Sequence, residues 1–367
     1  MLNGLALPRH FGVEKEGGKI FIFKEGYGDI VRSAEFRNPK SAIPNLRTVR
    51  GRGEYPRIPL EGGGTAIIRR VRHGGLWGKA TGDLLWGVGR PVRELINANK
   101  ALERGVPTAE ILGIRLEAAG PPLTGPFYRA EVFSRELPET IDLLELLASS
   151  ESTLDVQRHK RQGHSRPDES PSPSGRGKGE GDSPPPFPPP SRGRVSMWQG
   201  YSRHKGEIIR AVALSVRAMH EAGLYHNDLH LKNILITKST SGGPFKAYII
   251  DLDKSSLHES LSLNQRIKNL LRLDRSVEKF MIVGAYRRAL GRFAVANNTP
   301  LRPITQRDRL RFLRDYMGGS HTWKEMARGW QGHSRHPGRT FHRWWWWVLG
   351  VMGIDPYGLR RNQESKG

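Results

Sequence analysis

Short stretches of alternating apolar and polar residues predict β-strands in the first third of the chain. Lys19 to Lys24 reads KIFIFK, and Thr65 to Arg70 follows a glycine-rich turn. Further strands are expected around Ile111 to Leu116 and around Tyr128 to Phe133. Between these pairs of strands, Val92 to Arg104 has the spacing of an amphipathic helix. The order of elements predicts a mixed α and β domain rather than an all-helical one.

The apolar period then changes to that of helices. Ile141 to Leu147 predicts a short helix, and a long one begins near residue 206 and ends at Gly223, a good C-cap. Leu263 to Phe293 predicts one or two basic helices, and Thr305 to Met317 another. The long helix has four apolar residues at helical spacing, expected to lie in the core: Ile208, Val212, Val216 and Met219.

Two apolar runs between Leu224 and Lys254 each border acidic residues. Asp228 precedes Asn233 by five positions, and Asn233 leads directly into Ile234-Leu235-Ile236. The second run, Tyr248-Ile249-Ile250, ends at Asp251 after a Gly-Gly-Pro turn. This pattern predicts a β-hairpin that brings both acids to the same end.

Such an arrangement suits phosphoryl transfer, which needs a carboxylate to orient and deprotonate a hydroxyl and oxygen ligands for Mg²⁺. Asp228 is the candidate for the first role, and Asn233 and Asp251 for the second. His226 is expected to brace the loop rather than to act as the base. A surface hairpin with solvated acids is the alternative, but the spacing to Asn233 and the second strand ending in Asp favour a site.

The composition limits the partners and the cellular location that can be expected for the protein. The chain has 367 residues, no cysteine and a formal charge of +23, which predicts attraction to polyanions such as nucleic acid, anionic lipid or phosphorylated glycan. No run reaches the ~18 apolar residues of a membrane span, and the N-terminus lacks the pattern of a signal peptide. We therefore expect a cytoplasmic or peripherally membrane-bound protein.

Two segments have unusual composition. Residues 151–196 are dense in Pro, Gly and Ser, which predicts a disordered insertion; an inert insertion is favoured over a polyproline ligand for a partner. The tail carries Trp344 to Trp347 after basic residues. These tryptophans are expected to pack in a core, to anchor the protein at a membrane interface or to stack on single-stranded nucleic acid.

Several motifs resemble the bacterial lipopolysaccharide core kinases of the protein-kinase-like superfamily, and most of all the branch that acts on 3-deoxy-D-manno-octulosonic acid (Kdo). The resemblance covers roughly residues 48 to 280 apart from the insertion. It is carried by GRG and by the segments IIRRVRHGGLWGK, RPVRELINANKALERGVPTAEILG, HNDLHLKNILI, YIIDLDKS and NLLRLDRSVEK. It implies an α+β, bilobal protein-kinase-like fold with a small β-rich N-lobe and a larger helical C-lobe.

The resemblance also implies roles for charged residues near the nucleotide. Arg69 takes the strand position at which kinases carry a lysine, and Glu94 of the following helix would pair with it. Arg70 and Lys79 are the other cations that could meet the phosphates. Taken without the resemblance, Glu94 reads as a solvated acid in the first turn of a helix, where the helix dipole stabilises it.

Further nucleotide contacts are expected from glycines and backbone. Gly51 and Gly53 could let the backbone approach phosphates closely, although an ordinary glycine-rich turn is the alternative. Lys232 is a candidate extra cation for the γ-phosphate. The resemblance places the hinge between the lobes at Glu131 to Phe133, where backbone groups would pair with adenine.

The predicted organisation has six segments. They are an N-terminal extension with a strand (1–45), a nucleotide-binding N-lobe (46–135), a post-hinge helix (136–150), the disordered insertion (151–196), a catalytic C-lobe (197–335) and a Trp-rich basic C-terminal segment (336–367).

The predicted function is ATP-dependent, Mg²⁺-dependent phosphorylation of a sugar hydroxyl of the lipopolysaccharide inner core, at the cytoplasmic face of the bacterial inner membrane. The expected partners are the core glycolipid and an anionic membrane surface, with no specific nucleic acid and no obligate protein partner. Two alternatives stay open: a kinase acting on heptose, another small molecule or a protein, and a non-catalytic basic protein that binds nucleic acid or lipid.

Overall fold

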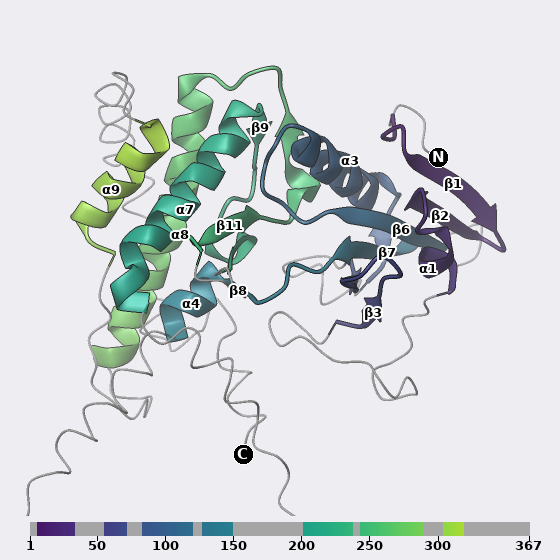
Figure 1. Ribbon diagram of the computed structural model, residues 1–367, viewed down its shortest axis with the longest axis horizontal. Helices are drawn as coiled ribbons and strands as arrows, with labels where there is room; N and C mark the ends of the chain where they lie inside the picture. The colour runs from purple at the N-terminus through teal and green to yellow at the C-terminus, as the bar shows by residue number, and fades with distance from the viewer. Residues whose placement is uncertain are drawn as a thin grey trace, which may run out of the picture.

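The protein has an antiparallel sheet in the first half of the chain and a bundle of helices in the second (Figure 1). The structure is a computed structural model, and it describes residues 6–33, 55–71, 83–119, 127–149, 201–237, 243–289 and 304–318. The α+β class with a β-rich first part and a helical second part is confirmed.

The larger sheet has the strand order β1-β2-β6-β7-β4-β3, with β5 pairing with β7. All four predicted strands are present in it, each within two residues of its predicted ends. The strand bounds are β1 Phe11–Glu16, β2 Lys19–Lys24, β3 Arg57–Pro59, β4 Thr65–Arg70, β5 Leu85–Trp86, β6 Ile111–Ala118 and β7 Phe127–Arg135.

Strand β1 was not predicted, because it lacks the alternation of a strand with one buried face. Five of its six residues are exposed. It forms a hairpin with β2 across Gly17 and Gly18, both of which have positive φ, and β2 continues the sheet by pairing with β6. The N-terminal hairpin is therefore part of the same sheet as the predicted N-lobe strands.

Helix α3, Gly89–Glu103, lies against the sheet and begins three residues before its predicted start. The proline at position 91 is compatible with this, because proline is well suited to the first turn of a helix. Val92, Leu95 and Ala101 of α3 join the core that includes Ile114 and other residues of β6 and β7. A short helix, α1 Gly28–Ser33, packs on β2 and β6.

The predicted hinge position is wrong. Glu131 to Phe133 pair with Arg115 to Gly113 of β6 on one side and with Arg70 to Ile68 of β4 on the other. A strand paired on both sides uses its N–H and C=O groups in the two ladders, so these residues have none to offer to adenine. The connection between the two halves is instead the segment 136–139, after β7 has ended.

The predicted helix Ile141 to Leu147 is partly strand. Thr140–Asp142 forms β8, in which Ile141 pairs with Ile236, and helix α4 runs over Leu143–Ser149. The Asp142 carboxylate accepts a hydrogen bond from the Glu145 amide at 2.8 Å, as an N-cap side chain does. The helix therefore starts two residues later than its apolar residues suggest.

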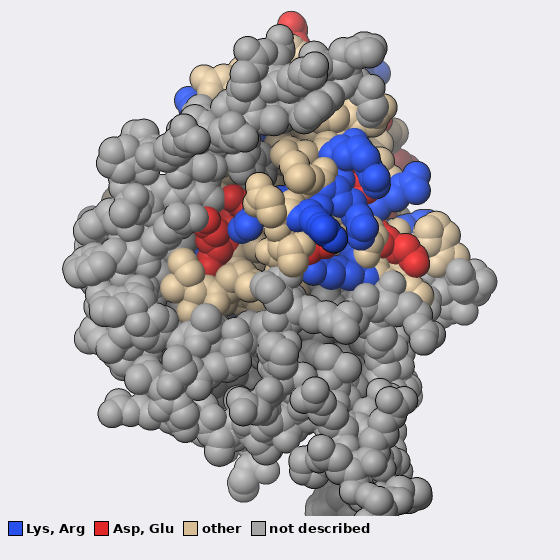
Figure 2. All heavy atoms as spheres, turned by 90° about the vertical axis from the view of Figure 1, so that its left-hand side faces the viewer, with Lys and Arg blue, Asp and Glu red and all other residues tan. Residues whose placement is uncertain are grey.

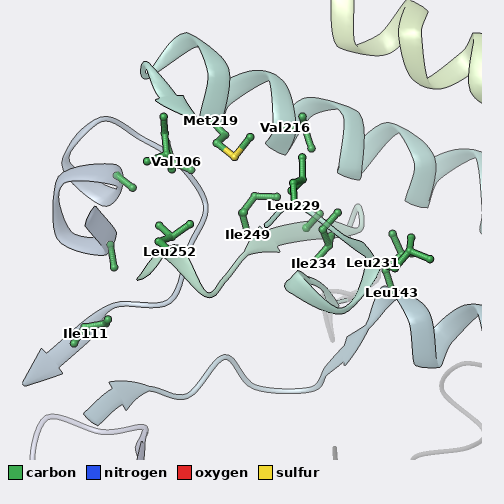
Figure 3. Packing of buried hydrophobic residues seen from close by; sticks show 14 of the residues in the cluster. Val106, Ile111, Leu143, Val216, Met219, Leu229, Leu231, Ile234, Ile249 and Leu252 are labelled. Atoms are coloured by element: carbon green, nitrogen blue, oxygen red, sulfur yellow. The ribbon is translucent and has the colours of Figure 1, made fainter. Parts of the chain in front are cut away.

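The helical half follows the sequence prediction closely. It contains α7 Tyr201–Glu221, α8 Leu263–Ala289 and α9 Gln306–Met317. The four predicted core residues of α7 are buried, and Val216 and Met219 face Ile249 of the hairpin (Figure 3). After α7, Gly223 has φ 75°, and a Cβ there would lie 2.1 Å from the carbonyl oxygen of His258. This position therefore requires glycine.

A chain of buried polar groups joins these helices. The Tyr316 hydroxyl of α9 lies 2.7 Å from Nδ1 of His220, and Nε2 of His220 lies 3.1 Å from Oδ1 of Asn269 on α8. The amide of Asn269 donates to the carbonyl of His226 at 2.7 Å. Since Asn269 presents its oxygen to His220, the imidazole donates from Nε2 and accepts from Tyr316 at Nδ1, which is the neutral form.

We expect His220 to make folding stability depend on pH. Its burial lowers its pKa from 6.5 to about 4. As the pH falls, His220 is therefore protonated in the unfolded chain before it is protonated in the folded protein. Its contribution to the free energy of unfolding is complete above about pH 6.5 and is lost as the pH falls towards 4. The full effect is about 3 kcal/mol, at about 1.4 kcal/mol per pKa unit.

Urea unfolding at several pH values checks this expectation. The variant His220→Gln should lose less unfolding free energy than the wild type between pH 6.5 and 4, whereas His258→Gln, a change at an exposed histidine, should follow the wild type. Parallel pH profiles of the wild type and His220→Gln would show that His220 is not the group responsible.

Several predictions fall outside the described residues: the glycines at positions 51 and 53, Lys79, the insertion and Trp344 to Trp347. In the parts of the chain that are described, no helix is long and apolar enough to cross a membrane.

Candidate active site

The hairpin predicted around the acidic residues is present. Strand β10, Ile234–Thr237, pairs antiparallel with β11, Lys246–Ile249, and Ile234 lies opposite Ile249. The Ile250 amide donates to the carbonyl of Asn233 at 2.9 Å, which closes the end of the hairpin. Asn233 and Asp251 therefore flank the same end, as their positions next to the two strands predict.

A second, short pairing joins the two loops that carry the acids. Strand β9, Leu224–Tyr225, precedes the loop with Asp228, and β12, Ser256–Leu257, follows the loop with Asp251. These strands pair antiparallel, with Tyr225 opposite Ser256. The Asn227 side chain adds a hydrogen bond of 2.9 Å to the carbonyl of Lys254. The two loops are thus tied together at both ends.

His226 braces the loop, as expected. It is fully buried, its Nε2 donates to the carbonyl of Ile250 at 3.1 Å, and its Nδ1 accepts from the Asp228 amide at 3.1 Å. Burial lowers the pKa of His226, which favours the neutral form that can donate at one nitrogen and accept at the other. The imidazole fixes the backbone on both sides and has no free nitrogen with which to act as a base.

Asp228 is accessible to solvent, with 40% of its side chain exposed. Its Oδ2 accepts a hydrogen bond from Nζ of Lys254 at 3.1 Å, and its Oδ1 lies 3.8 Å from Nε2 of His230. Partial burial acts to raise the pKa of Asp228, but the Lys254 hydrogen bond and the charges of His230 and Lys254 lower it below its ordinary value. The group is therefore an ionised acceptor that solvent can reach.

Asn233 is held from the other side of the loop. It ends the 3-10 turn η2, Leu231–Asn233, is fully buried, and donates from Nδ2 to the carbonyl of Asp228 at 2.9 Å. Lys232 lies in the same turn and is half-buried. The hydrogen bond sets the position of Asn233 relative to the loop of the candidate base.

Asp251 has a backbone conformation that is rare for its residue type. Its φ is 66° and its ψ is 57°, in the left-handed region, immediately before the 3-10 turn η3, Leu252–Lys254. Such conformations cost on the order of 1–3 kcal/mol and occur preferentially at functional sites. The loop is therefore held in a shape that turns the chain sharply at the end of the hairpin.

Arg69 and Glu94 form an ion pair between β4 and α3. Burial raises the pKa of Glu94, and the charge of Arg69 opposes this rise. The charges of Glu94 and, less strongly, Asp251 raise the pKa of Arg69, so Arg69 lies within electrostatic reach of the hairpin end. The pair predicted from the sequence is formed, and the charge of Asp251 acts on both of its members.

Arg70 has different neighbours. Its side chain lies 3.4 Å from the carboxylate of Glu131 and 3.6 Å from that of Asp83. Arg115 also pairs with Glu131. Of the two adjacent arginines, Arg69 is thus the one that pairs with Glu94 of α3.

Sequence reasoning missed three residues that contact the acidic loops. Lys254 contacts Asp228, Arg90 of α3 pairs with the buried Asp253, and Asn97 of α3 donates to the backbone of the Asp251 loop. Asp253 and Lys254 follow Asp251 closely, which is the only signal the sequence offers for them. Nothing in the sequence pattern points to Arg90 or Asn97, because their partners are more than 150 residues away.

The donors at this site fit a hard divalent cation. Asp251 supplies a carboxylate and Asn233 an amide, which are oxygen donors of the kind that Mg²⁺ takes together with water and phosphate. Among the described residues, no group of three or more His, Cys, Asp or Glu side chains could hold a metal ion. Asn233 and Asp251 would therefore hold such a cation only together with further oxygen ligands, such as water or phosphate.

Comparison with known proteins finds similar sequences and a similar solved structure. Residues 195–316 match the lipopolysaccharide kinase (Kdo/WaaP) family. A 3-deoxy-D-manno-octulosonic acid kinase of Vibrio cholerae serotype O1 is 25% identical over 235 residues, 63% of this chain and 73% of that protein. A solved structure of WaaP in complex with acyl carrier protein aligns at TM-score 0.39 and 18% identity, over 90% of this chain and 98% of that one.

The segment that matches the family includes Asp228, Asn233 and Asp251. The structure brings these residues together at the end of one hairpin, opposite the Arg69–Glu94 pair. Over this segment the chain is similar to the lipopolysaccharide kinase (Kdo/WaaP) family, which indicates that it is a kinase.

Proposed function

We propose that this kinase transfers the γ-phosphate of ATP to a hydroxyl of Kdo in the lipopolysaccharide inner core. The observation that carries this proposal is the accessible, ionised Asp228 held beside Asn233 and Asp251 at the end of the hairpin. The similarity to a Kdo kinase supports Kdo as the acceptor.

Asp228 is the group that orients the acceptor hydroxyl and takes its proton. Phosphoryl transfer needs little covalent help from a protein, so positioning and charge carry most of the catalysis. The low pKa of Asp228 keeps it ionised near neutral pH, ready to accept a hydrogen bond from the sugar. Lys254, which contacts Asp228, holds the carboxylate in place and adds positive charge close to the transferred group.

Asn233 and Asp251 would hold Mg²⁺ with the nucleotide phosphates. The bound cation would neutralise phosphate charge, which is its general contribution in kinases. Arg69, supported by Glu94, adds a fixed positive charge on the opposite side, next to Asp251. We place Lys232 near the γ-phosphate and Gly51 and Gly53 over the phosphates, as the family resemblance implies.

Replacing Lys254 by Met should raise the pKa of Asp228, because the hydrogen bond and charge that lower it are removed. The acid limb of the pH–rate profile should then move to higher pH, since Asp228 must be ionised to act. Turnover at pH 7 should fall by about tenfold, in line with the loss of a hydrogen bond to a charged group.

The exposed Lys246 on β11 offers a matched control, because Lys246→Met removes the same charge away from Asp228. Its profile should coincide with that of the wild type. An unchanged acid limb in a folded Lys254→Met variant would show that Lys254 does not act on the catalytic carboxylate.

The acceptor can be tested by incubating the purified protein with γ-labelled ATP and a panel of core glycolipids that end in Kdo or in heptose. We expect label on the glycolipids that expose Kdo. Label only on heptose-bearing acceptors would favour the alternative sugar, and binding without any ATP turnover would favour a non-catalytic lipid-binding or nucleic-acid-binding protein.

We also propose that the protein approaches an anionic membrane surface at the cytoplasmic face of the inner membrane, where such a glycolipid is anchored. Lysine and arginine side chains gather on the face of the helical half that carries α9 (Figure 2). Arg210 of α7 and Arg307 and Arg311 of α9 are exposed, and none has an ion pair with another described residue. Together with the net charge of +23, they favour long-range attraction that salt should weaken.

A further inference from the structure

One face of helix α3 carries polar side chains that reach across to the helical half. Arg90, Asn97 and Arg104 follow one another at intervals of seven residues, close to two turns, so they lie along one stripe of the helix. Glu94, which pairs with Arg69, lies between the first two on the same side. Glu94 contacts the sheet through Arg69 of β4, whereas Arg90, Asn97 and Arg104 contact the helical half.

Each residue of the stripe has a partner far away in the sequence. Arg90 pairs with Asp253, whose side chain is 3% exposed. Arg104, just after the helix, donates to the carbonyls of Ala222 at 2.6 Å and His258 at 3.1 Å. The helix is thus fastened at both ends to the segments that surround the candidate metal loop.

Asn97 sits between these two fastenings and contacts the loop itself. Its Nδ2 donates to the carbonyl of Leu252 at 2.9 Å and to that of Ser255 at 2.8 Å. Leu252 begins the 3-10 turn η3, and Ser255 follows it. The two hydrogens of a single amide group therefore bind carbonyls at the two ends of the turn that follows Asp251.

The loop is held by several contacts, among which those of Asn97 reach carbonyls at both ends of η3. Asp251 adopts a left-handed conformation, and η3 is a single turn, which is a short and weakly hydrogen-bonded element. Asn97 is only 8% exposed, so water would not easily replace its amide. Removing the amide would leave two carbonyls with weaker support at the point where the strained loop begins.

We propose that Asn97 is a positioning residue for the metal loop. Its amide fixes the backbone around Asp251 relative to the Arg69–Glu94 pair. The distance between Asp251 and Arg69, which lie on the two sides of the nucleotide phosphates, is then kept constant. A consequence is that α3 and the loop form one rigid unit. This proposal rests on the proposed function, in which Asp251 holds Mg²⁺.

Asn99, two residues further along, provides a matched control. It is also 8% exposed, and its Nδ2 also donates to two carbonyls, those of Leu95 at 3.0 Å and Ile111 at 3.3 Å. Both of these partners belong to the sheet half of the molecule. Asn97→Ala and Asn99→Ala therefore remove equivalent groups, but only the first touches the metal loop.

Hydrogen exchange without nucleotide gives a readout that does not depend on activity. Backbone amides of residues 250–256 should exchange faster in Asn97→Ala than in the wild type, while Asn99→Ala should leave them unchanged. Equal exchange of this segment in both variants would overturn the proposal. Should Asn97→Ala fail to fold, Asn97→Ser, which keeps one donor, is compared with the wild type and Asn99→Ala in the same way.

Titration with Mg²⁺ in the presence of a non-hydrolysable ATP analogue provides the second readout. Changes in groups that support metal ligands commonly cost about 10–100-fold in metal affinity. Asn97→Ala should therefore need about 10-fold or more Mg²⁺ for half-maximal nucleotide binding, and Asn99→Ala less than about twofold more. Equal requirements in the two folded variants would contradict the role of Asn97. A wild type that binds nucleotide with no response to Mg²⁺ would instead overturn the proposed function and this proposal with it.

Discussion

Replacing Asp228 by Asn should lower turnover by about 10²–10⁴ while the protein stays folded and binds nucleotide. The amide is close in shape to the carboxylate but cannot take a proton from the acceptor. Because 40% of the Asp228 side chain is exposed, the change should have little effect on packing. Turnover and nucleotide affinity measured on the same preparation separate the loss of chemistry from the loss of binding.

Asp251→Asn serves as the comparison, because it should weaken Mg²⁺-dependent nucleotide binding rather than turnover alone. A folded Asp228→Asn variant with turnover like that of the wild type would remove Asp228 from the reaction. If both variants kept wild-type turnover, the site would have to lie elsewhere.

Replacing Arg69 by Ala is expected to lower turnover by about 10²–10³, the range seen when one charge-stabilising donor is lost from an active site. The change removes a positive charge that interacts with Asp251 and leaves the buried Glu94 without its partner. Since burial already raises the pKa of Glu94, this carboxylate should then become protonated more readily. Steady-state kinetics with circular dichroism as a folding check measures the effect.

The neighbouring Arg70 provides the matched variant. It is equally part of β4 and contacts Glu131 and Asp83, so Arg70→Ala removes comparable ion pairs but leaves the Arg69–Glu94 pair intact. The turnover of Arg69→Lys should lie between those of the wild type and Arg69→Ala, because lysine keeps the positive charge but not the planar guanidinium with its several donors. Equal losses of turnover in Arg69→Ala and Arg70→Ala would mean that Arg69 acts through the stability of the fold and not at the active site.

The sequence predicted those parts of the site whose residues are close together along the chain. Asp228, Asn233 and Asp251 adjoin apolar strands, so the hairpin register brings them to one end. The Arg69–Glu94 pair joins elements only 25 residues apart and was inferred from the family resemblance. The local sequence pattern was sufficient to predict the first group, and the family motif was sufficient to predict the second.

Other features depend on contacts that no local pattern encodes. The ladder on both sides of Glu131 to Phe133 excludes the predicted hinge, and it could be known only once the order of the strands was known. Strand β1 is largely exposed and shows no alternation. The contact of Asn97 with Leu252 spans 155 residues. Such features follow from how the two halves pack together.

Transfer of label from γ-labelled ATP to Kdo-lipid A is the most direct measure of the proposed phosphorylation of Kdo. The purified wild type should label the glycolipid when Mg²⁺ is present, and omission of the metal or the Asp228→Asn change should abolish labelling. Mass spectrometry of the product should place a single phosphoryl group on Kdo. A folded wild-type protein that leaves Kdo-lipid A unlabelled under these conditions, while it phosphorylates another acceptor, would contradict the account.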